Sequence, residues 1–184
     1  MLAQDLRSVI RQRVLQGVSI ALCAFVMIGV NYPLLQPQSR LALFGLLGLV
    51  LVFLQFPVLK SRASGKFLLG SDWILSTIAI LCFGYVILQT EPTFSRWWIG
   101  GNSLGDRAGQ EVLSDYIVGF TGLILILEAA RRTVGFTLPL LALSFLLYAH
   151  FGPNLPDWLF PHRGYGWSRI VSQAFLHSQG VFGI

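Results

Sequence analysis

Long apolar runs alternate with short charged or turn-rich segments along most of this chain. Runs that begin near Gly17, Leu41, Trp73 and Asp115 approach the roughly 20 residues that a helix needs to cross a bilayer. A further apolar run follows over residues 138–151. Backbone polar groups in lipid must be satisfied within their own segment, and a helix achieves this. The pattern therefore predicts an all-α integral membrane protein with about five transmembrane helices.

The stretch 115–151 organises the prediction, because it is too long for one span and suits two spans joined by a tight turn. We expect the first three spans over about 17–35, 41–59 and 73–89. The shorter runs would cross only with flanking residues or in a locally thinned bilayer. Gly45 and Gly48 share one face of the second predicted span, which would let a neighbouring helix approach closely.

Amphipathic helices are predicted at both ends of the chain. Residues 1–16 carry apolar side chains at helical spacing together with three arginines, so they suit the membrane surface. A solvated basic flank that only sets orientation is an equally good interpretation. Near the other end, Ser168 would cap a helix from Arg169 to about Ser178 with one apolar face, which we expect to lie flat on the membrane. That face consists of Ile170, Val171, Ala174 and Phe175.

Composition agrees with a membrane location: 54% of the residues are hydrophobic and 11% are charged, against about 25% charged in a soluble domain. The net charge of +5 resides in short loops, and no basic stripe with interleaved aromatics predicts a nucleic-acid partner. Basic loops favour the cytoplasm, which places the N-terminus, the 60–70 loop and Arg131 and Arg132 inside. The 90–115 loop and the tail after Phe151 are then predicted outside.

Tryptophans in the predicted outer segments suit a membrane interface, where the ring is apolar and the N–H is hydrated. The predicted interfacial anchors are Trp97, Trp98, Trp158 and Trp167. Glycines at 100, 101 and 105 predict a turn-rich loop beside the first pair.

Glu128 is the acidic residue within or beside an apolar helix, and Arg131 and Arg132 follow it at the i+3 and i+4 positions. Side chains at those spacings reach one another, so we predict a structural ion-pair cluster at the cytoplasmic end of the fourth span. A proton or ion relay is the open alternative, because carboxylates inside membranes often serve transport.

Catalytic motifs are not found: the sequence has no phosphate-binding loop, nucleophile elbow or zinc-binding helix pair. The three histidines are scattered, so we expect no catalytic, cofactor-binding or metal site. Cys23 and Cys82 both lie in apolar runs, which predicts free thiols. The sequence thus does not predict an enzyme.

Several separated sequence words resemble the fused permeases of TRAP (tripartite ATP-independent periplasmic) transporters, of the 4TM/12TM type that works with TAXI-class binding proteins. The words are Leu-Glu-Ala-Ala-Arg-Arg-Thr-Val-Gly at 127–135, Leu-Pro-Leu-Leu-Ala-Leu at 138–143, Phe-Leu-Leu-Tyr at 145–148, His-Arg-Gly-Tyr at 162–165, Arg-Ile-Val-Ser at 169–172 and Gly-Val-Phe-Gly-Ile at 180–184. The specific part of the resemblance covers roughly residues 115–184, whereas the first three spans agree only in number and hydrophobicity.

The resemblance implies that residues 17–135 form the small, Q-type four-helix domain, preceded by the amphipathic helix 1–16. Residues 136–152 would be a connecting transmembrane helix, and residues 153–184 a periplasmic-side interfacial tail. This tail would lead towards a large M-type domain that the chain lacks. In that family the M part holds the moving element and the sodium and solute sites, so no such residue is assigned here.

On this interpretation the protein is a scaffold in a bacterial inner membrane. Its expected partners are the lipid bilayer, a large M-type permease subunit or domain, and a periplasmic solute-binding protein. Sodium is expected in the large partner, and no cofactor in this chain. The alternative is a small membrane assembly or interaction protein, without transport activity and unrelated to TRAP systems.

Overall fold

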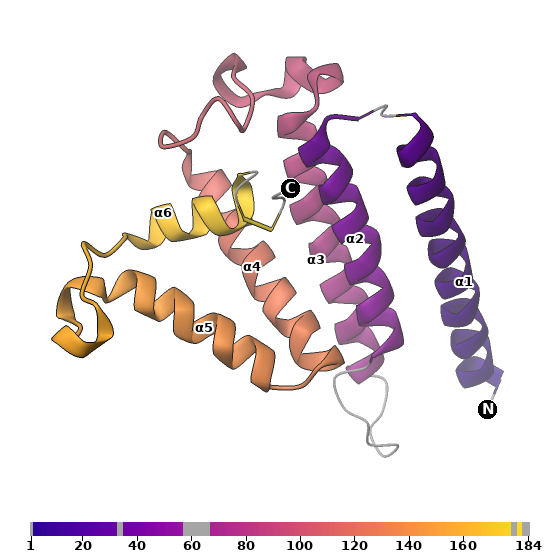
Figure 1. The fold of residues 1–184 in the computed structure, drawn as a ribbon. Helices are drawn as coiled ribbons and strands as arrows, with labels where there is room; N and C mark the ends of the chain where they lie inside the picture. Colours follow the sequence, from indigo (N-terminus) through magenta and orange to yellow (C-terminus); the bar gives the residue numbers. More distant parts are fainter. Residues whose placement is uncertain (1, 33–34, 57–66, 178–179, 182–184) are drawn as a thin grey trace. The chain divides into compact units, whose positions relative to one another are not determined.

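The computed structural model describes residues 2–32, 35–56, 67–177 and 180–181, and in these residues all regular secondary structure is helical (Figure 1). The prediction of an all-α chain is confirmed for this part. The α-helices are α1 (Leu2–Asn31), α2 (Pro37–Gln55), α3 (Phe67–Thr90), α4 (Leu113–Thr133), α5 (Thr137–His150) and α6 (Trp167–Val171). Short 3₁₀ segments are η1 (Pro92–Trp97), η2 (Ile99–Gly101), η3 (Gly152–Asn154) and η4 (Asp157–Leu159), and the π-helical turn η5 spans Ser172–Leu176.

In the part of the chain that the structure describes, four helices are long and apolar enough to cross a membrane, which indicates a membrane-embedded protein. The apolar segments are Val9–Asn31, Pro37–Gln55, Ser71–Thr90 and Leu113–Thr133. The fifth predicted span corresponds to α5, which is apolar but has 14 residues. At 1.5 Å per residue α5 is about 21 Å long, against a hydrocarbon core of about 30 Å. A fifth crossing therefore stays a prediction.

The first helix is continuous across the predicted surface segment 1–16 and the first predicted span. α1 runs without interruption from Leu2 to Asn31, and its apolar segment begins at Val9. Gly17 is tolerated within the helix, since an isolated glycine costs only about 1 kcal/mol. The first candidate span thus begins earlier than predicted, and a surface location for its first turns stays a prediction.

The chain forms two compact units, Met1–Ile87 and Leu88–Ile184, each considered by itself. In the first unit α1 and α2 pack side by side, and Arg11 Nε donates a 2.6 Å hydrogen bond to the Leu54 carbonyl. The predicted close approach at Gly45 is present, because a Cβ there would lie 3.0 Å from the Phe83 ring. Gly48 instead faces open space.

In the second unit the chain leaves α4, turns through α5 and returns to α4 with α6 (Figure 1). The turn after α4 uses Gly135, whose φ of +96° is accessible to glycine but unfavourable for other residues. Its N–H donates to the Arg131 carbonyl at 3.1 Å and satisfies one of the last carbonyls of the helix. The predicted tight turn in 115–151 is therefore present between two helices.

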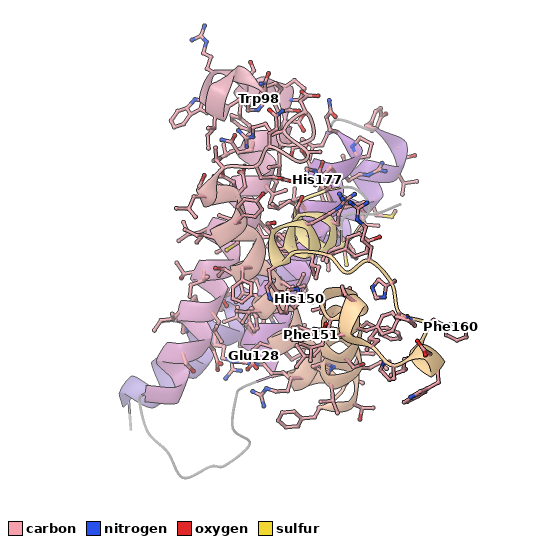
Figure 2. All side chains as sticks on the ribbon, turned by 90° about the vertical axis from the view of Figure 1, so that its left-hand side faces the viewer. Trp98, Glu128, His150, Phe151, Phe160 and His177 are labelled. Carbon is pink, nitrogen blue, oxygen red and sulfur yellow. The ribbon has the colours of Figure 1, made fainter. Side chains whose placement is uncertain are left out.

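Residues 152–166 contain three prolines, at 153, 156 and 161, and fold back over the end of α5. The Tyr165 N–H bonds to the Ala149 carbonyl at 2.9 Å. The Tyr148 hydroxyl lies 3.2 Å from the carbonyls of both Leu159 and Phe160. Phe160 has a left-handed backbone (φ 53°), and its side chain projects outward with 82% exposure (Figure 2).

The C-terminal helix differs from the prediction in its start. α6 begins at Trp167, and no side chain caps it. Three residues of the predicted apolar face, Ile170, Val171 and Phe175, are buried, and Val171 and Phe175 lie against α4 together with Leu176. A pair of glycines on α4 leaves room for these side chains. A location of this segment at the membrane surface stays a prediction.

Candidate functional site

The glycine pair lies on the face of α4 that receives α6 and η5. A Cβ at Gly119 would be 2.7 Å from Val171 Cγ1, and one at Gly122 would be 2.1 Å from Phe175 Cζ. Both distances are too short for real atoms, so any other residue would displace the C-terminal segment. Phe175 is fully buried in this position. The pattern of Gly45 and Gly48 was predicted from the sequence and this pair was not, although its i, i+3 spacing is the same signal.

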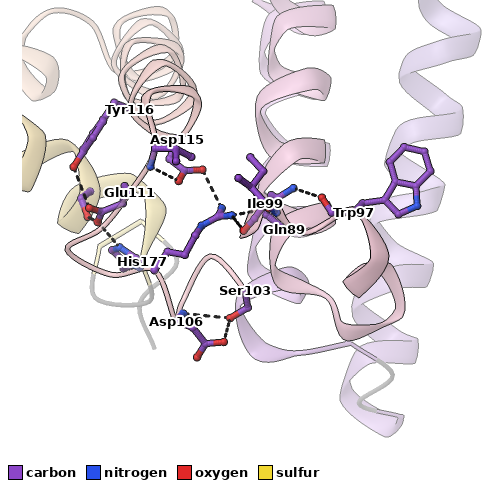
Figure 3. A network of polar contacts seen from close by, with 12 residues as sticks. Gln89, Trp97, Ile99, Ser103, Asp106, Glu111, Asp115, Tyr116 and His177 are labelled. Atoms are coloured by element: carbon purple, nitrogen blue, oxygen red, sulfur yellow. Dashed lines mark hydrogen bonds and ion pairs between the residues drawn. The ribbon is translucent and has the colours of Figure 1, made fainter. Parts of the chain in front are cut away.

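Glu111, immediately before α4, joins the same segment through hydrogen bonds (Figure 3). Its Oε1 accepts hydrogen bonds from Ser172 Oγ and, at 2.9 Å, from His177 Nε2. Its Oε2 accepts a 3.0 Å hydrogen bond from the Tyr116 hydroxyl. We name these four residues the Glu111 clamp. It links the start of α4 to residues 61 and 66 positions later.

The clamp keeps its carboxylate ionised. Burial of Glu111 opposes ionisation, but hydrogen bonds from Ser172 and His177, helped by backbone N–H groups, outweigh it and lower the pKa to about 2. The Glu111 side chain is only 2% exposed. The carboxylate is therefore charged at neutral pH and held by donors from the C-terminal segment.

Serine, histidine and glutamate are also the residue types of a hydrolytic triad, but the clamp has a different geometry. In a triad the histidine bonds to the serine with one ring nitrogen and to the acid with the other. Here Ser172 and His177 both bind the same oxygen of Glu111. The arrangement is suited to holding the C-terminal segment against the start of α4.

A second buried network fastens the connection between α3 and α4 (Figure 3). Gln89 Oε1 accepts hydrogen bonds from the Ile99 N–H at 3.1 Å and from Arg107 Nη1 at 3.2 Å. Its Nε2 donates to the Trp97 carbonyl at 2.9 Å. Arg107 also donates to the Ile99 carbonyl at 2.8 Å and forms a 3.1 Å ion pair with Asp115.

Asp115 ties this network to the first turn of α4. Its Oδ2 accepts a 3.0 Å hydrogen bond from the Val112 N–H, which caps the helix. Asp115 is fully buried and Arg107 is 6% exposed, so each supplies the countercharge that the other needs. The turn-rich character of this loop was predicted, and Gly100 and Gly101 both have positive φ. The network itself was not predicted.

At the other end of α4 the structure brings together the three residues of the predicted ion-pair cluster. Arg131 Nε and Nη2 each lie 2.7 Å from a different oxygen of Glu128. Arg132 Nε lies 2.9 Å from Oε1. The side chains of Arg131, Glu128 and Arg132 are 28%, 24% and 1% exposed. Figure 2 shows Glu128 well separated from His177, which bonds to Glu111 at the other end of α4. A structural role for the cluster, as against a relay, stays a prediction.

The predicted interfacial tryptophans lie in different environments. Trp97 and Trp158 are strongly exposed. Trp167 stacks on His150 with 4.5 Å between ring centroids. Trp98 is half-buried, and its Nε1 has no hydrogen-bond partner among the described residues. Their role as membrane anchors stays a prediction.

The remaining histidines and the cysteines form no common site. His150 Nδ1 lies 2.9 Å from the Tyr165 carbonyl, and His162 stacks on Tyr148 at 4.8 Å. Both cysteines are free, as predicted. Among residues 2–32, 35–56, 67–177 and 180–181, no group of three or more His, Cys, Asp or Glu could hold a metal ion. The basic 60–70 loop, used above for topology, lies largely outside the described residues.

Comparisons of the chain with protein-family models, curated proteins and solved structures find no match. The resemblance to TRAP permeases therefore depends on the sequence words quoted above.

Proposed function

We propose that this chain is the small membrane subunit or domain of a sodium-coupled TRAP-type solute symporter. It serves as the fixed scaffold beside which a large transport subunit moves, and it works with a periplasmic TAXI-class binding protein. The ordered sequence words over 115–184 and the four apolar helices support this proposal.

One observation carries the scaffold role: two apolar helices keep exposed apolar side chains that the described residues do not cover. None of the apolar segment of α1 is buried, and α5 has no buried residue. Val30 on α1 and Phe145 on α5 are 79% and 64% exposed. Such surfaces require lipid or a partner helix, and a scaffold for a multi-span partner would present them.

The polar groups of α4 favour support over conduction. Glu128 is paired with two arginines of its own helix, and Asp115 with Arg107 of the preceding loop. A relay group must exchange partners during transport, whereas these groups are held by ion pairs at 2.7–3.1 Å. The sodium and solute sites are accordingly assigned to the large partner.

The proposed topology puts the chain in a bacterial inner membrane with its N-terminus in the cytoplasm. Arg131 and Arg132 are cytoplasmic, the 90–115 loop and the tail are periplasmic, and α5 is the connecting crossing. Single cysteines in a background without Cys23 and Cys82 test this arrangement. Labels at Ser64 and Val134 should react from the same side, and a label at Ser103 from the opposite side. Opposite labelling of Ser64 and Val134 would refute the threading.

The scaffold role is tested by photocrosslinking in cells that also express a candidate large permease. Crosslinkers at Val30 and Phe145 should each capture the large permease, identified by mass spectrometry. A crosslinker at fully buried Phe83 is the matched control and should not. Liposomes that contain only this chain should show no sodium-dependent uptake. Uptake by those liposomes would contradict the proposal.

The alternative is a small membrane protein with an assembly or interaction role, unrelated to TRAP systems. The genomic context distinguishes the two functions. The TRAP-subunit proposal is favoured by a large permease that continues in frame after Ile184 or is encoded next to it, together with a binding-protein gene. The Glu128→Ala variant adds a second test. We expect a lower yield of complex with unchanged sodium dependence, and an altered sodium Hill coefficient would favour a relay.

A further inference from the structure

A groove of about 310 Å³ lies at the junction between the end of α4 and the start of α5. This size is at the low end of small-molecule pockets, which span about 300–1,000 Å³, so part of one slender apolar chain would fill it. The lining is apolar except for one ion pair. Its principal residues are Ile124, Leu127, Leu140 and Leu143, with Glu128 and Arg131 as the polar members.

The charged edge of the groove carries an excess of positive charge. Glu128 is shared between Arg131 and Arg132, so two guanidinium groups and one carboxylate leave one net positive charge. Arg131 directs its Nε and Nη2 to Glu128, and its Nη1 has no hydrogen-bond partner among the described residues. The side chain is 28% exposed, and its guanidinium lies over the Phe136 ring, 5.4 Å from the centroid. A donor for an anion is therefore available at the groove.

The charged and apolar parts are arranged along a candidate membrane span. Arg131 lies in the last turn of α4, where α5 begins after a short turn. Ile124, at the other end of the lining, lies seven residues earlier, or about 10 Å along the helix axis. The groove thus has a cationic group near the helix end and an apolar wall towards the middle of the span.

We propose that this groove binds an anionic phospholipid, with its phosphate on Arg131 and part of one acyl chain against Leu140 and Leu143. Charge complementarity selects the headgroup, and the apolar lining selects the chain. Basic pockets between membrane helices bind anionic headgroups in this way. A free phosphate ion would leave the apolar wall uncovered. The proposal concerns residues of α4 and α5 alone, and it holds whether or not the chain belongs to a TRAP system.

Native mass spectrometry of the purified full chain tests the proposal. The chain is titrated with phosphatidylglycerol or with phosphatidylcholine of the same acyl chains, in the same detergent. We expect tighter retention of phosphatidylglycerol, weakened about fivefold in Arg131→Gln, since one basic group near a lipid surface contributes on that scale. Arg131→Lys should retain most of the preference. Arg96→Gln, an exposed arginine on η1, is the matched charge control and should bind like wild type.

A second pair of variants tests the apolar wall. Leu140→Trp fills the groove and should reduce retention of phosphatidylglycerol, whereas Leu141→Trp on the neighbouring exposed position should not. If the tryptophan variant does not fold, the Arg131 series decides alone. Equal retention of the two lipids by wild type, or an unchanged preference in Arg131→Gln, would overturn the proposal. So would displacement of the lipid by millimolar inorganic phosphate, or a dimer that Leu140→Trp abolishes, which would assign the groove to a second copy.

Discussion

The two ends of α4 hold their carboxylates in different ways. At the start, Glu111 binds residues 61 and 66 positions away, and buried Asp115 pairs with Arg107 eight positions earlier. At the end, Glu128 binds Arg131 and Arg132, three and four positions later. The Glu111 and Asp115 side chains are 2% and 0% exposed, and that of Glu128 is 24% exposed.

This difference separates tertiary from local interactions. The Glu111 clamp and the Asp115 ion pair exist only when a loop or the C-terminal segment has docked. The Glu128 cluster needs only one turn of helix, and its arginines also complement the negative end of the helix dipole. The start of α4 should therefore be sensitive to substitution, and the end should tolerate it.

Asp115→Ala should have the largest effect, a loss of about 3–5 kcal/mol in the free energy of unfolding, because it leaves Arg107 buried without its countercharge. Thermal or denaturant unfolding in detergent measures the loss. Asp106→Ala is the control: Asp106 lies in the same loop but is exposed, and its side chain bonds only to Ser103 among the described contacts. Equal losses of unfolding free energy in the two variants would show that the buried ion pair contributes no more to stability than the exposed contact of Asp106.

Gly122→Ala should lower the free energy of unfolding by about 1–3 kcal/mol, as overpacking does, because the added methyl group meets the Phe175 ring. Limited proteolysis should then cut the C-terminal segment faster. Gly48→Ala, whose methyl group would meet open space, should be neutral or slightly stabilising. Combining Gly122→Ala with Phe175→Leu shortens the opposing side chain and should recover part of the loss. No recovery would mean that the clash is not the cause.

Glu111→Gln should lower the free energy of unfolding by about 1–3 kcal/mol at neutral pH, since it removes the charge from a hydrogen-bonded carboxylate. The folded pKa of Glu111, about 2, lies below its ordinary value of 4.5. The folded state therefore binds fewer protons, and the stabilisation is full above pH 4.5 and lost as the pH falls towards 2. Unfolding measured across this interval should show a smaller pH dependence in the variant. An unchanged pH dependence would exclude Glu111 as its source.

Glu128→Gln should have the smallest effect, below about 1 kcal/mol, because partly exposed ion pairs within one helix contribute little. The same unfolding assay measures it, and Glu111→Gln serves as the matched substitution. A greater loss at Glu128 than at Glu111 would reverse the contrast between the two ends of α4.

Local patterns in the sequence predicted the features that depend on local interactions. Apolar runs predicted the helices, and the spacing of Glu128 from Arg131 and Arg132 predicted its two ion pairs. The division after residue 16 stays a prediction, since α1 runs continuously from Leu2 to Asn31.

Features that join distant segments were not predictable in the same way. Nothing near Glu111 identifies Ser172 or His177 as its partners, because their separation is set by the path through α5. The apolar face of α6 suited lipid and protein equally, and only the Gly119 and Gly122 pair could have favoured protein. Likewise, Gln89, Arg107 and Asp115 are ordinary polar residues until the loop brings them together.

The packing of Val171 against Gly119 and of Phe175 against Gly122 also sets an order of events during synthesis. Each glycine is synthesised more than fifty residues before the side chain that packs against it. At about 5–20 residues per second, that interval lasts several seconds. Throughout it, the nascent chain exposes the space beside Gly119 and Gly122, and Glu111 lacks its donors Ser172 and His177.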